Sequence, residues 1–227
     1  MGKIIIGEET SKYPLQLIGK YAGVCWGADV NDAEKNIKRA KKCIADGHGR
    51  VLEFPQIYMI LDEYSARVIR EYYTHIGGDP TRLQESTRYV DCTNFRYVTP
   101  PSIEKIEEAK QLYDKEMSYI SKTITSLEKV YNIPREDSAM LLPLGMETKV
   151  VVRTDLRNLI DMSRNRDCSR AYWEFRKLMN NIETSLSELS DEWEYIVKDQ
   201  FKPKCEILGY CPESNNPCGR KPSKVDL

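Results

Sequence analysis

The nine residues 81–89 read TRLQESTRY, and the rest of the chain is organised around them. They follow a GGDP turn at residues 77–80 and precede an apolar run at residues 95–98. In an extended chain, side chains two residues apart point to the same side, so Ser86 and Arg88 could reach one anion together. A hydroxyl beside a guanidinium suits a phosphate monoester. The simpler interpretation is a solvated strand edge that carries Thr and Arg by chance, because short motifs often match by chance.

Length and composition describe an ordinary globular protein. The chain has 227 residues, of which 41% are hydrophobic and 30% charged, and this fits one large or two small domains. We expect one catalytic domain over residues 1–200 and an irregular tail over residues 201–227. The formal net charge of -1 gives no general attraction to nucleic acid or to anionic lipid. With no apolar run of membrane-spanning length and no signal-peptide pattern, we expect a cytoplasmic protein that binds neither.

The seven cysteines are an odd number, and four are scattered through apparent secondary structure: Cys25, Cys43, Cys92 and Cys168. Such scattering favours a reducing cytoplasm. The other three form a C-x5-C-x6-C pattern in the tail, at Cys205, Cys211 and Cys218. A zinc site needs four ligands and no His lies near, so we expect free or transiently oxidised thiols and no metal. With two His in all, a His-rich metal site and a Ser-His-Asp triad are both nearly excluded.

The hydrophobic pattern predicts mixed α and β structure. We expect an edge strand at residues 3–6, a strand and turn at 13–26, and a strand at 148–153. Asn31 or Asp32 can cap a helix that Gly47 ends, and Ser65 can cap a helix over residues 65–73. Residues 57–61 fit a strand or a buried helix equally well. Further helices are expected at residues 134–140, after Asp155, at 170–180 and from residue 190, whereas the tail from residue 201 is expected to be irregular.

The clearest element is a long amphipathic helix of about 28 residues, over positions 102–130. Its apolar side chains recur every three or four residues, at Ile103, Ile106, Tyr113, Met117, Ile120, Ile124 and Leu127. Pro134 follows its end. A helix this long on a domain of modest size usually packs against a partner as well as against its own core.

Four motifs follow one another in a set order over about residues 20–180. They are GH at 47–48 with LE at 52–53, YTHI at 73–76, S-x-R-Y at 86–89, and DLR at 155–157 followed by Arg166 and AYWE at 171–174. Together they resemble the flavin-dependent thymidylate synthases, the ThyX family. The resemblance implies an α+β fold with a mixed, largely antiparallel sheet flanked by helices, and a homotetramer in which the long helix packs between subunits.

The resemblance also implies an activity and its small-molecule partners. The reaction is reductive C5 methylation of dUMP to dTMP, with methylenetetrahydrofolate as the carbon donor, FAD as the cofactor and NADPH as the reductant. Arg166 matches the Arg that the family places against the pyrimidine ring, where it acts in catalysis. The implied nucleotide-binding residues are Glu71, Gln84, Glu85, Ser86, Thr87 and Arg88, together with Arg166. The implied flavin-binding residues are Thr74, His75, Ile76, Arg157, Asp161 and Arg170.

Several positions depart from the family pattern. An Arg-His-Arg trio appears here as Thr74-His75-Ile76, the His of a Glu-His pair is Phe54, and a later His is Arg170. Two guanidiniums that could meet flavin phosphates are therefore absent, and we expect weaker flavin binding. Two alternatives stay open at this stage: C5 modification of another pyrimidine nucleotide such as dCMP, and a nucleotide-binding module that has lost flavin chemistry. Simpler roles also stay open for His75 as a helix C-cap and for Arg157 in an ion pair.

Overall fold

The computed structural model describes residues 2–213 and 216–224, and the chain divides into two compact units. The first unit comprises Met1–Lys3, Leu61–Thr74 and Leu83–Val151. The second comprises Ile4–Ile60, His75–Arg82 and Val152–Leu227. Each unit is thus assembled from three separate stretches of sequence. The expected boundary between a catalytic domain and a tail at residue 200 stays a prediction.

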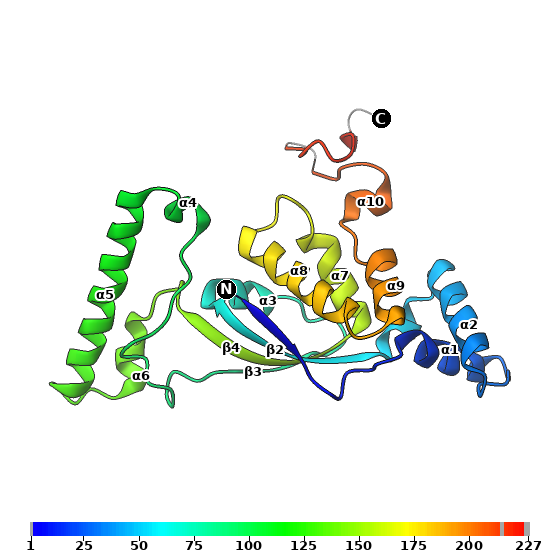
Figure 1. Ribbon diagram of the computed structural model, residues 1–227, viewed down its shortest axis with the longest axis horizontal. Coiled ribbons are helices and arrows are strands. Elements are labelled where there is room, and N and C mark those ends of the chain that lie inside the picture. Colours follow the sequence, from blue (N-terminus) through cyan, green and yellow to red (C-terminus); the bar gives the residue numbers. More distant parts are fainter. Residues whose placement is uncertain (1, 214–215, 225–227) are drawn as a thin grey trace. The chain divides into compact units, whose positions relative to one another are not determined.

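Four strands form one antiparallel sheet in the order β1-β2-β4-β3 (Figure 1). Their bounds are Lys3–Ile6 for β1, Gln56–Ser65 for β2, Glu147–Asp155 for β4 and Thr81–Gln84 for β3. Residues 57–61, which the pattern left undecided, belong to β2. With helices around this sheet, the α+β prediction is confirmed.

Alternation of side chains decides which face of the two long strands is buried. Ile57, Met59 and Leu61 of β2 have at most 1% of their surface exposed, and Val150 and Val152 of β4 have none. Successive side chains of a strand point to opposite faces, so these residues form one continuous apolar face. The residues between them, Tyr58, Ile60 and Val151, occupy the other face and are half-buried or exposed.

Besides strand residues, the first unit contains helix α3 and a group of helices after residue 100. Ser65 caps α3, Ala66–Tyr72, by accepting from Val68 N, as predicted. The predicted long helix is present as α5, Glu107–Lys129, but its expected start is wrong. Ile106 has extended backbone angles and separates α5 from the short α4, Pro101–Glu104. Two short helices follow: α6, Arg135–Ser138, and η2, Ala139–Leu141.

The second unit is rich in helices, and its first helix corrects the prediction of a strand at residues 13–26. That segment is α1, Pro14–Cys25. A Cβ at Gly19 would lie 1.8 Å from the carbonyl oxygen of Asn36, so this glycine permits close packing of α1 on α2, Ala33–Ala45. Glycines that read as turn signals are therefore contact points between helices.

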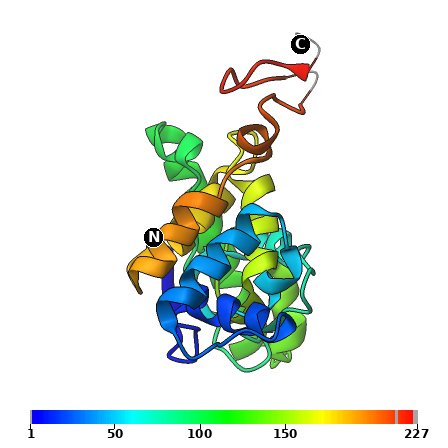
Figure 2. The ribbon, with the colours of Figure 1, turned by 90° about the vertical axis from the view of Figure 1, so that its right-hand side faces the viewer.

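The remaining helices of the second unit begin largely where capping rules place them. Asp32 caps α2, and Gly47, with φ +77°, follows its end. Ser190 caps α9 by accepting from Trp193 N at 3.3 Å. The other bounds are Gly49–Glu53 for η1, Leu156–Arg166 for α7, Trp173–Ser187 for α8, Asp191–Gln200 for α9 and Lys204–Leu208 for α10. The expectation of a fully irregular tail is wrong at α10 (Figure 2).

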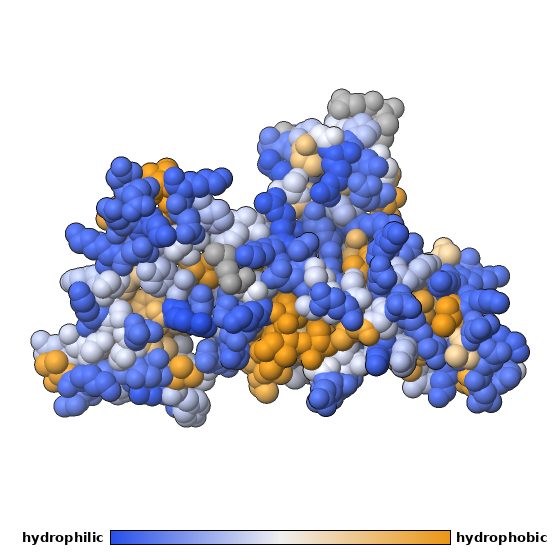
Figure 3. Space-filling view, viewed as in Figure 1, coloured by the Kyte–Doolittle hydropathy of each residue, from blue (hydrophilic) through white to orange (hydrophobic). Residues whose placement is uncertain are grey.

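The core of the second unit includes Trp193, Phe175 and Ile182, all fully buried. The Trp193 indole donates to the carbonyl oxygen of Ser11 at 2.9 Å, which satisfies its one polar group. The visible surface is largely hydrophilic, with separate apolar patches (Figure 3). Within residues 2–213 and 216–224, no helix is both long enough and apolar enough to cross a membrane.

Candidate functional site

The predicted phosphate-binding stretch lies in the first unit and forms a turn. Strand β3 ends at Gln84, and the backbone N–H groups of Tyr89 and Val90 both donate to the carbonyl oxygen of Ser86 at 3.1 Å. The Ser86 hydroxyl accepts from the backbone N–H of Arg88 at 3.3 Å. The assumption of extended chain from Ser86 to Arg88 is therefore wrong, because a turn places the hydroxyl beside the backbone of Arg88.

The guanidinium of Arg88 is held by a carboxylate that the sequence did not suggest. Its Nε donates to Glu136 Oε2 at 2.8 Å, and the two side chains are 63% and 55% exposed. An exposed pair of this kind contributes at most about 1 kcal/mol. A ligand phosphate can therefore compete with Glu136 for Arg88 at low cost.

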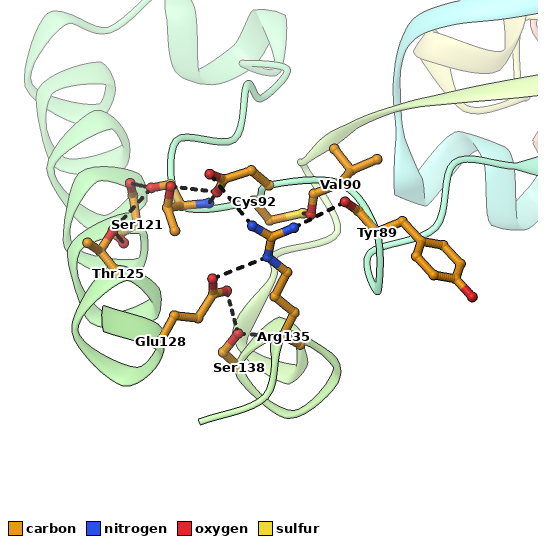
Figure 4. A network of polar contacts seen from close by, with 10 residues as sticks. Tyr89, Val90, Cys92, Ser121, Thr125, Glu128, Arg135 and Ser138 are labelled. Carbon is orange, nitrogen blue, oxygen red and sulfur yellow. Dashed lines mark hydrogen bonds and ion pairs between the residues drawn. The ribbon is translucent and has the colours of Figure 1, made fainter. Parts of the chain in front are cut away.

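A network of polar contacts fixes the chain after this turn (Figure 4). Arg135 donates to the carbonyl oxygen of Tyr89 at 3.1 Å and lies 3.5 Å from Glu128 Oε2. The Ser138 hydroxyl donates to the other oxygen of Glu128 at 2.7 Å, and Ser121 donates to the carbonyl oxygen of Thr93. The turn is thereby attached to α5 and α6 rather than left as an isolated surface loop.

The other predicted nucleotide-binding residues of the first unit have distinct surroundings. Gln84 donates to Thr148 Oγ1 at 3.2 Å. Glu85 and Thr87 line a cavity of about 200 Å³ whose wall also carries three further carboxylates and one guanidinium, from Asp62, Asp91, Glu147 and Arg96. This excess of negative charge disfavours a phosphate inside the cavity. Glu71 and Thr74 line a separate hollow with Arg67, Arg70 and Leu144.

In the second unit, a glycine pair packs against the start of α7. Asp155 is 3% exposed and caps α7 by accepting from Asn158 N at 2.7 Å, as predicted. A Cβ at Gly78 would lie 1.9 Å from Asp155 Oδ2, and one at Gly77 would lie 3.1 Å from Asn158 Oδ1. Gly78 also has φ +68°, so both its backbone angle and its surroundings favour glycine.

This packing holds the 75–82 segment beside α7, where His75 meets Arg166. The Arg166 Nε donates to His75 Nε2 at 3.0 Å. The guanidinium carbon lies 4.4 Å from the centroid of the Phe175 ring, and the His75 ring meets the same ring edge-on at 5.6 Å. Arg82 donates to the His75 carbonyl oxygen. The imidazole of His75 and the phenyl ring of Phe175 thus hold the Arg166 guanidinium in position.

The imidazole of His75 is neutral in this arrangement. A guanidinium can only donate, so the Nε2 atom of His75 must carry the lone pair and the proton must sit on Nδ1. Burial, followed by the charges of Arg166 and Arg82, lowers the pKa of His75 from 6.5 to about 4. At neutral pH, His75 therefore positions Arg166 without adding positive charge.

The remaining predicted flavin-binding residues are nearer the surface. Arg157 forms an ion pair with Glu53 at 2.7 Å, and hydrogen bonding from Arg157 lowers the pKa of the Glu53 carboxyl. Asp161 pairs with Arg164 at 2.7 Å. Ile76 is 75% exposed and cannot replace a guanidinium. Arg170 is exposed and lines a cavity with the C-terminal segment.

Sequence reasoning missed the residues that support these side chains. Arg153 donates to the carbonyl oxygen of Asp79 at 2.7 Å and to Thr81 Oγ1 at 3.2 Å, and so helps Arg82 to hold the 75–82 segment. Glu136 and Phe175 likewise contact residues distant in sequence. No local pattern marks such partners, and only their contacts in the fold identify them.

A family model for the thymidylate synthase complementing protein matches residues 8–190. The chain belongs to this family. A flavin-dependent thymidylate synthase from Clostridium tetani is 32% identical over 238 aligned residues, covering 93% of this chain and 91% of that protein. The protein of the same name from Pyrococcus furiosus is 30% identical and covers 81% of this chain and 74% of its own length. The resemblance drawn from the motifs is thereby confirmed.

A solved structure of a family member has the same fold. The crystal structure of thymidylate synthase X from Helicobacter pylori, which contains FAD and dUMP, superposes with a TM-score of 0.67. The superposition covers 89% of this chain and 100% of that chain at 16% sequence identity. At 16% identity, this likeness supports the ThyX fold but does not assign roles to individual residues.

Proposed function

We propose that this chain is a flavin-dependent thymidylate synthase that methylates C5 of dUMP to give dTMP. The observation that carries the proposal is the 32% identity to a synthase over nearly the full length of both proteins. Methylenetetrahydrofolate is the proposed carbon donor, and NADPH is the proposed reductant. Bound FAD supplies the hydride that reduces the transferred carbon to a methyl group.

The proposed role of Arg166 is electrostatic. From the sequence, no Cys is expected at the position of a nucleophile that attacks C6, and this agrees with a family that does without one. The pyrimidine ring must then become electron-rich at C5, and negative charge builds on its N3 and O4 edge. A guanidinium held in position by His75 and Phe175 stabilises that charge more strongly in the transition state than in the ground state. Neutral His75 leaves the full positive charge on Arg166.

The proposed phosphate contacts are Ser86 and Arg88, at the turn after β3. Glu71, Gln84, Glu85 and Thr87 are the proposed neighbours of the nucleotide. A phosphate would take the place of Glu136 on the Arg88 guanidinium, and this exchange of one anion for another leaves no cation unpaired. The exposed position of both side chains makes the exchange inexpensive.

For flavin, the donor set on this chain fits an anionic cofactor, although with fewer cations than the family pattern has. Arg157 and Arg170 are the guanidiniums proposed to meet its phosphates, with Thr74, His75, Ile76 and Asp161 nearby by resemblance. Binding by Arg157 would compete with its ion pair to Glu53. We therefore propose that FAD binds reversibly rather than permanently.

We also propose a cytoplasmic homotetramer. All seven cysteines are free thiols in the structure, and this fits a reducing compartment. Helix α5 buries only Met117 and Ile124, whereas Leu112 and Tyr119 are 60% and 67% exposed. A helix with this much exposed apolar surface is suited to packing against another subunit. Light scattering on the purified protein, with a mass of four chains expected, tests the assembly.

Turnover by the Arg166→Lys variant tests the function. Lysine keeps the charge but loses the planar fork, so nucleotide affinity should change little while turnover of dUMP falls by about 100-fold, similar to the loss of one oxyanion-hole donor. Arg164→Lys, on the same helix turn, is the matched control and should stay active. Full turnover by Arg166→Lys would refute the role of Arg166. A colourless wild-type protein that takes up no FAD, or one that prefers dCMP, would refute the proposed reaction.

A further inference from the structure

Two acidic side chains of the second unit meet where α7 ends against α8. Asp167 is the C-cap of α7, and its backbone N–H donates to the carbonyl oxygen of Ser163 at 2.9 Å. Glu183 lies on α8, which packs against α7 (Figure 1). The carboxyl groups of Asp167 and Glu183 are hydrogen-bonded to each other. Such a bond requires a proton on one of them, because an ionised carboxylate can only accept.

One oxygen of Glu183 indicates which carboxyl group carries this proton. The Oε1 atom is buried and has no hydrogen-bond partner within residues 2–213 and 216–224. A buried oxygen that accepts no hydrogen bond destabilises the fold. A proton on Glu183 removes this problem, because the protonated carboxyl becomes a donor and Asp167 is the acceptor beside it.

The groups around the pair favour one negative charge, placed on Asp167. The guanidinium of Arg220, on the C-terminal segment, and the side chain of Ser163, on α7, both favour the ionised form of Asp167. Arg220 Nη1 also donates to the carbonyl oxygen of Asp167 at 3.4 Å. The charged group that faces Glu183 among the described residues is Asp167 itself. A second negative charge would also lie near the C-terminal end of α7, where the helix dipole disfavours anions.

This arrangement retains a proton at neutral pH. Burial raises the pKa of both carboxyl groups, and the adjacent charge of Asp167 raises the pKa of Glu183 further, to about 8. Because the two groups interact, they titrate as a pair that shares the proton. Loss of this proton leaves two buried carboxylates in contact, and these repel each other.

The pair acts on the backbone directly after Arg166. Arg166 is the last residue of α7, and Asp167 is the next residue. Phe175, also on α8, lies with its ring centroid 4.4 Å from the Arg166 guanidinium carbon. Helix α8 therefore holds the side chain of Arg166 through Phe175 and the backbone beside it through Glu183.

We propose that Asp167 and Glu183 share one proton that fixes the end of α7 against α8 and so positions Arg166 for the reaction. The inference rests on the function proposed above for Arg166. Both acidic residues are positioning residues, since they act through the α7 backbone. At alkaline pH the proton passes to solvent, the two carboxylates repel each other, and the end of α7 is no longer held against α8.

Carboxyl carbon NMR on the full-length protein with ¹³C-labelled glutamate tests the shared proton. One glutamate carboxyl should stay protonated at neutral pH and titrate near 8. This signal should be absent from Glu183→Gln and present in Glu188→Gln, the matched control, because Glu188 is exposed at the end of the same helix. A wild type in which no glutamate carboxyl titrates above neutral pH would overturn the proposal, and this measurement needs no variant. A signal that persists in Glu183→Gln would overturn it as well.

Rates of dTMP formation test the positioning of Arg166. Wild-type kcat should fall by about tenfold for each pH unit above the pKa of Glu183, with KM for dUMP little changed, because Arg166 acts in the transition state. Glu183→Ala should lower kcat at neutral pH by up to about 100-fold. Glu183→Gln keeps a hydrogen-bond donor and cannot ionise, so it should restore kcat and remove the alkaline decline.

The same assay separates this inference from the proposed function. An equal alkaline decline in wild type and Glu183→Gln would overturn the positioning role, as would a Glu183→Ala variant with wild-type kcat. Protein that forms no dTMP at any pH would refute the proposed function and, with it, the positioning of Arg166 for that reaction. The NMR titration would still decide whether Asp167 and Glu183 share a proton.

Discussion

Replacing Gly78 with alanine should destabilise the second unit far more than the same change at another left-handed glycine. Gly78 has φ +68°, and a Cβ there would lie 1.9 Å from Asp155 Oδ2. Gly27 has φ +60° and nothing within 4 Å of a Cβ, so it is a matched control for the backbone angle alone. An alanine in the left-handed region costs about 1–2 kcal/mol. At Gly78 the methyl group must also displace a buried capping carboxylate.

The size of the additional effect follows from what Asp155 does. Losing an N-cap costs about 1 kcal/mol, and forcing a methyl group into a packed site costs about 1–3 kcal/mol. We therefore expect a loss in the free energy of unfolding of about 3 kcal/mol or more for Gly78→Ala, against about 1–2 for Gly27→Ala. A chain of this size loses about 3 °C in Tm for each kcal/mol, so the expected Tm losses are about 9 °C and about 4 °C.

Urea unfolding monitored by circular dichroism, together with thermal melts, gives both quantities. A double-mutant cycle adds a sharper test: in an Asp155→Ala background the clash is gone, so Gly78→Ala should cost only as much as Gly27→Ala. Equal losses for the two glycine variants in the wild-type background would refute the close approach of Gly78 to Asp155. A cost at Gly78 that is unchanged by Asp155→Ala would show that another contact is responsible.

Three further outcomes are expected. His75 should titrate by NMR with a pKa of about 4 instead of 6.5. Its neutral form stabilises the fold fully above pH 6.5, and this contribution is lost as the pH falls through 4. A measured pKa of 6.5 would contradict its contact with Arg166. Arg88→Ala should weaken dUMP binding by about tenfold to a hundredfold, the loss of a charge-assisted contact, while Glu136→Gln should tighten it by up to about fivefold; calorimetry that finds both affinities unchanged would remove the pair from the phosphate site. FAD should bind to apo-protein but leave on exhaustive dialysis, and tight retention would argue against the loss of affinity at Thr74 and Ile76.

Sequence-based predictions were confirmed where a side chain acts only on residues close to it in sequence. Ser65, Asp155 and Ser190 cap the helices they were expected to cap, because an N-cap needs only a side-chain oxygen and the next turn of backbone. The long amphipathic helix was likewise evident from its spacing. Its start was misplaced because extended backbone at Ile106 is not marked by any residue preference.

Contacts between distant residues account for what the sequence could not predict. Residues 13–26 were read as a strand because their glycines resemble turn signals, whereas Gly19 is small so that α1 can approach Asn36. Ser86 and Arg88 were expected to share one side of an extended chain, and the turn that joins them instead depends on hydrogen bonds to Ser86. The pairing of His75 with Arg166 joins residues separated by 91 positions. The family motifs predicted both as site residues without revealing this contact.

Because each unit is built from separate stretches of sequence, the second unit cannot finish folding until the end of the chain has been synthesised. Residues Ile4–Ile60 belong to the second unit, which also needs Val152 onward. At a synthesis rate of about 5–20 residues per second, the early residues wait roughly 5–20 s for their partners. During that time, the apolar face of β2 that β4 and the later helices cover is exposed to other chains near the ribosome. For the same reason, no single cut in the gene releases either unit as a continuous fragment, so separate expression of either one requires its segments to be joined by new linkers.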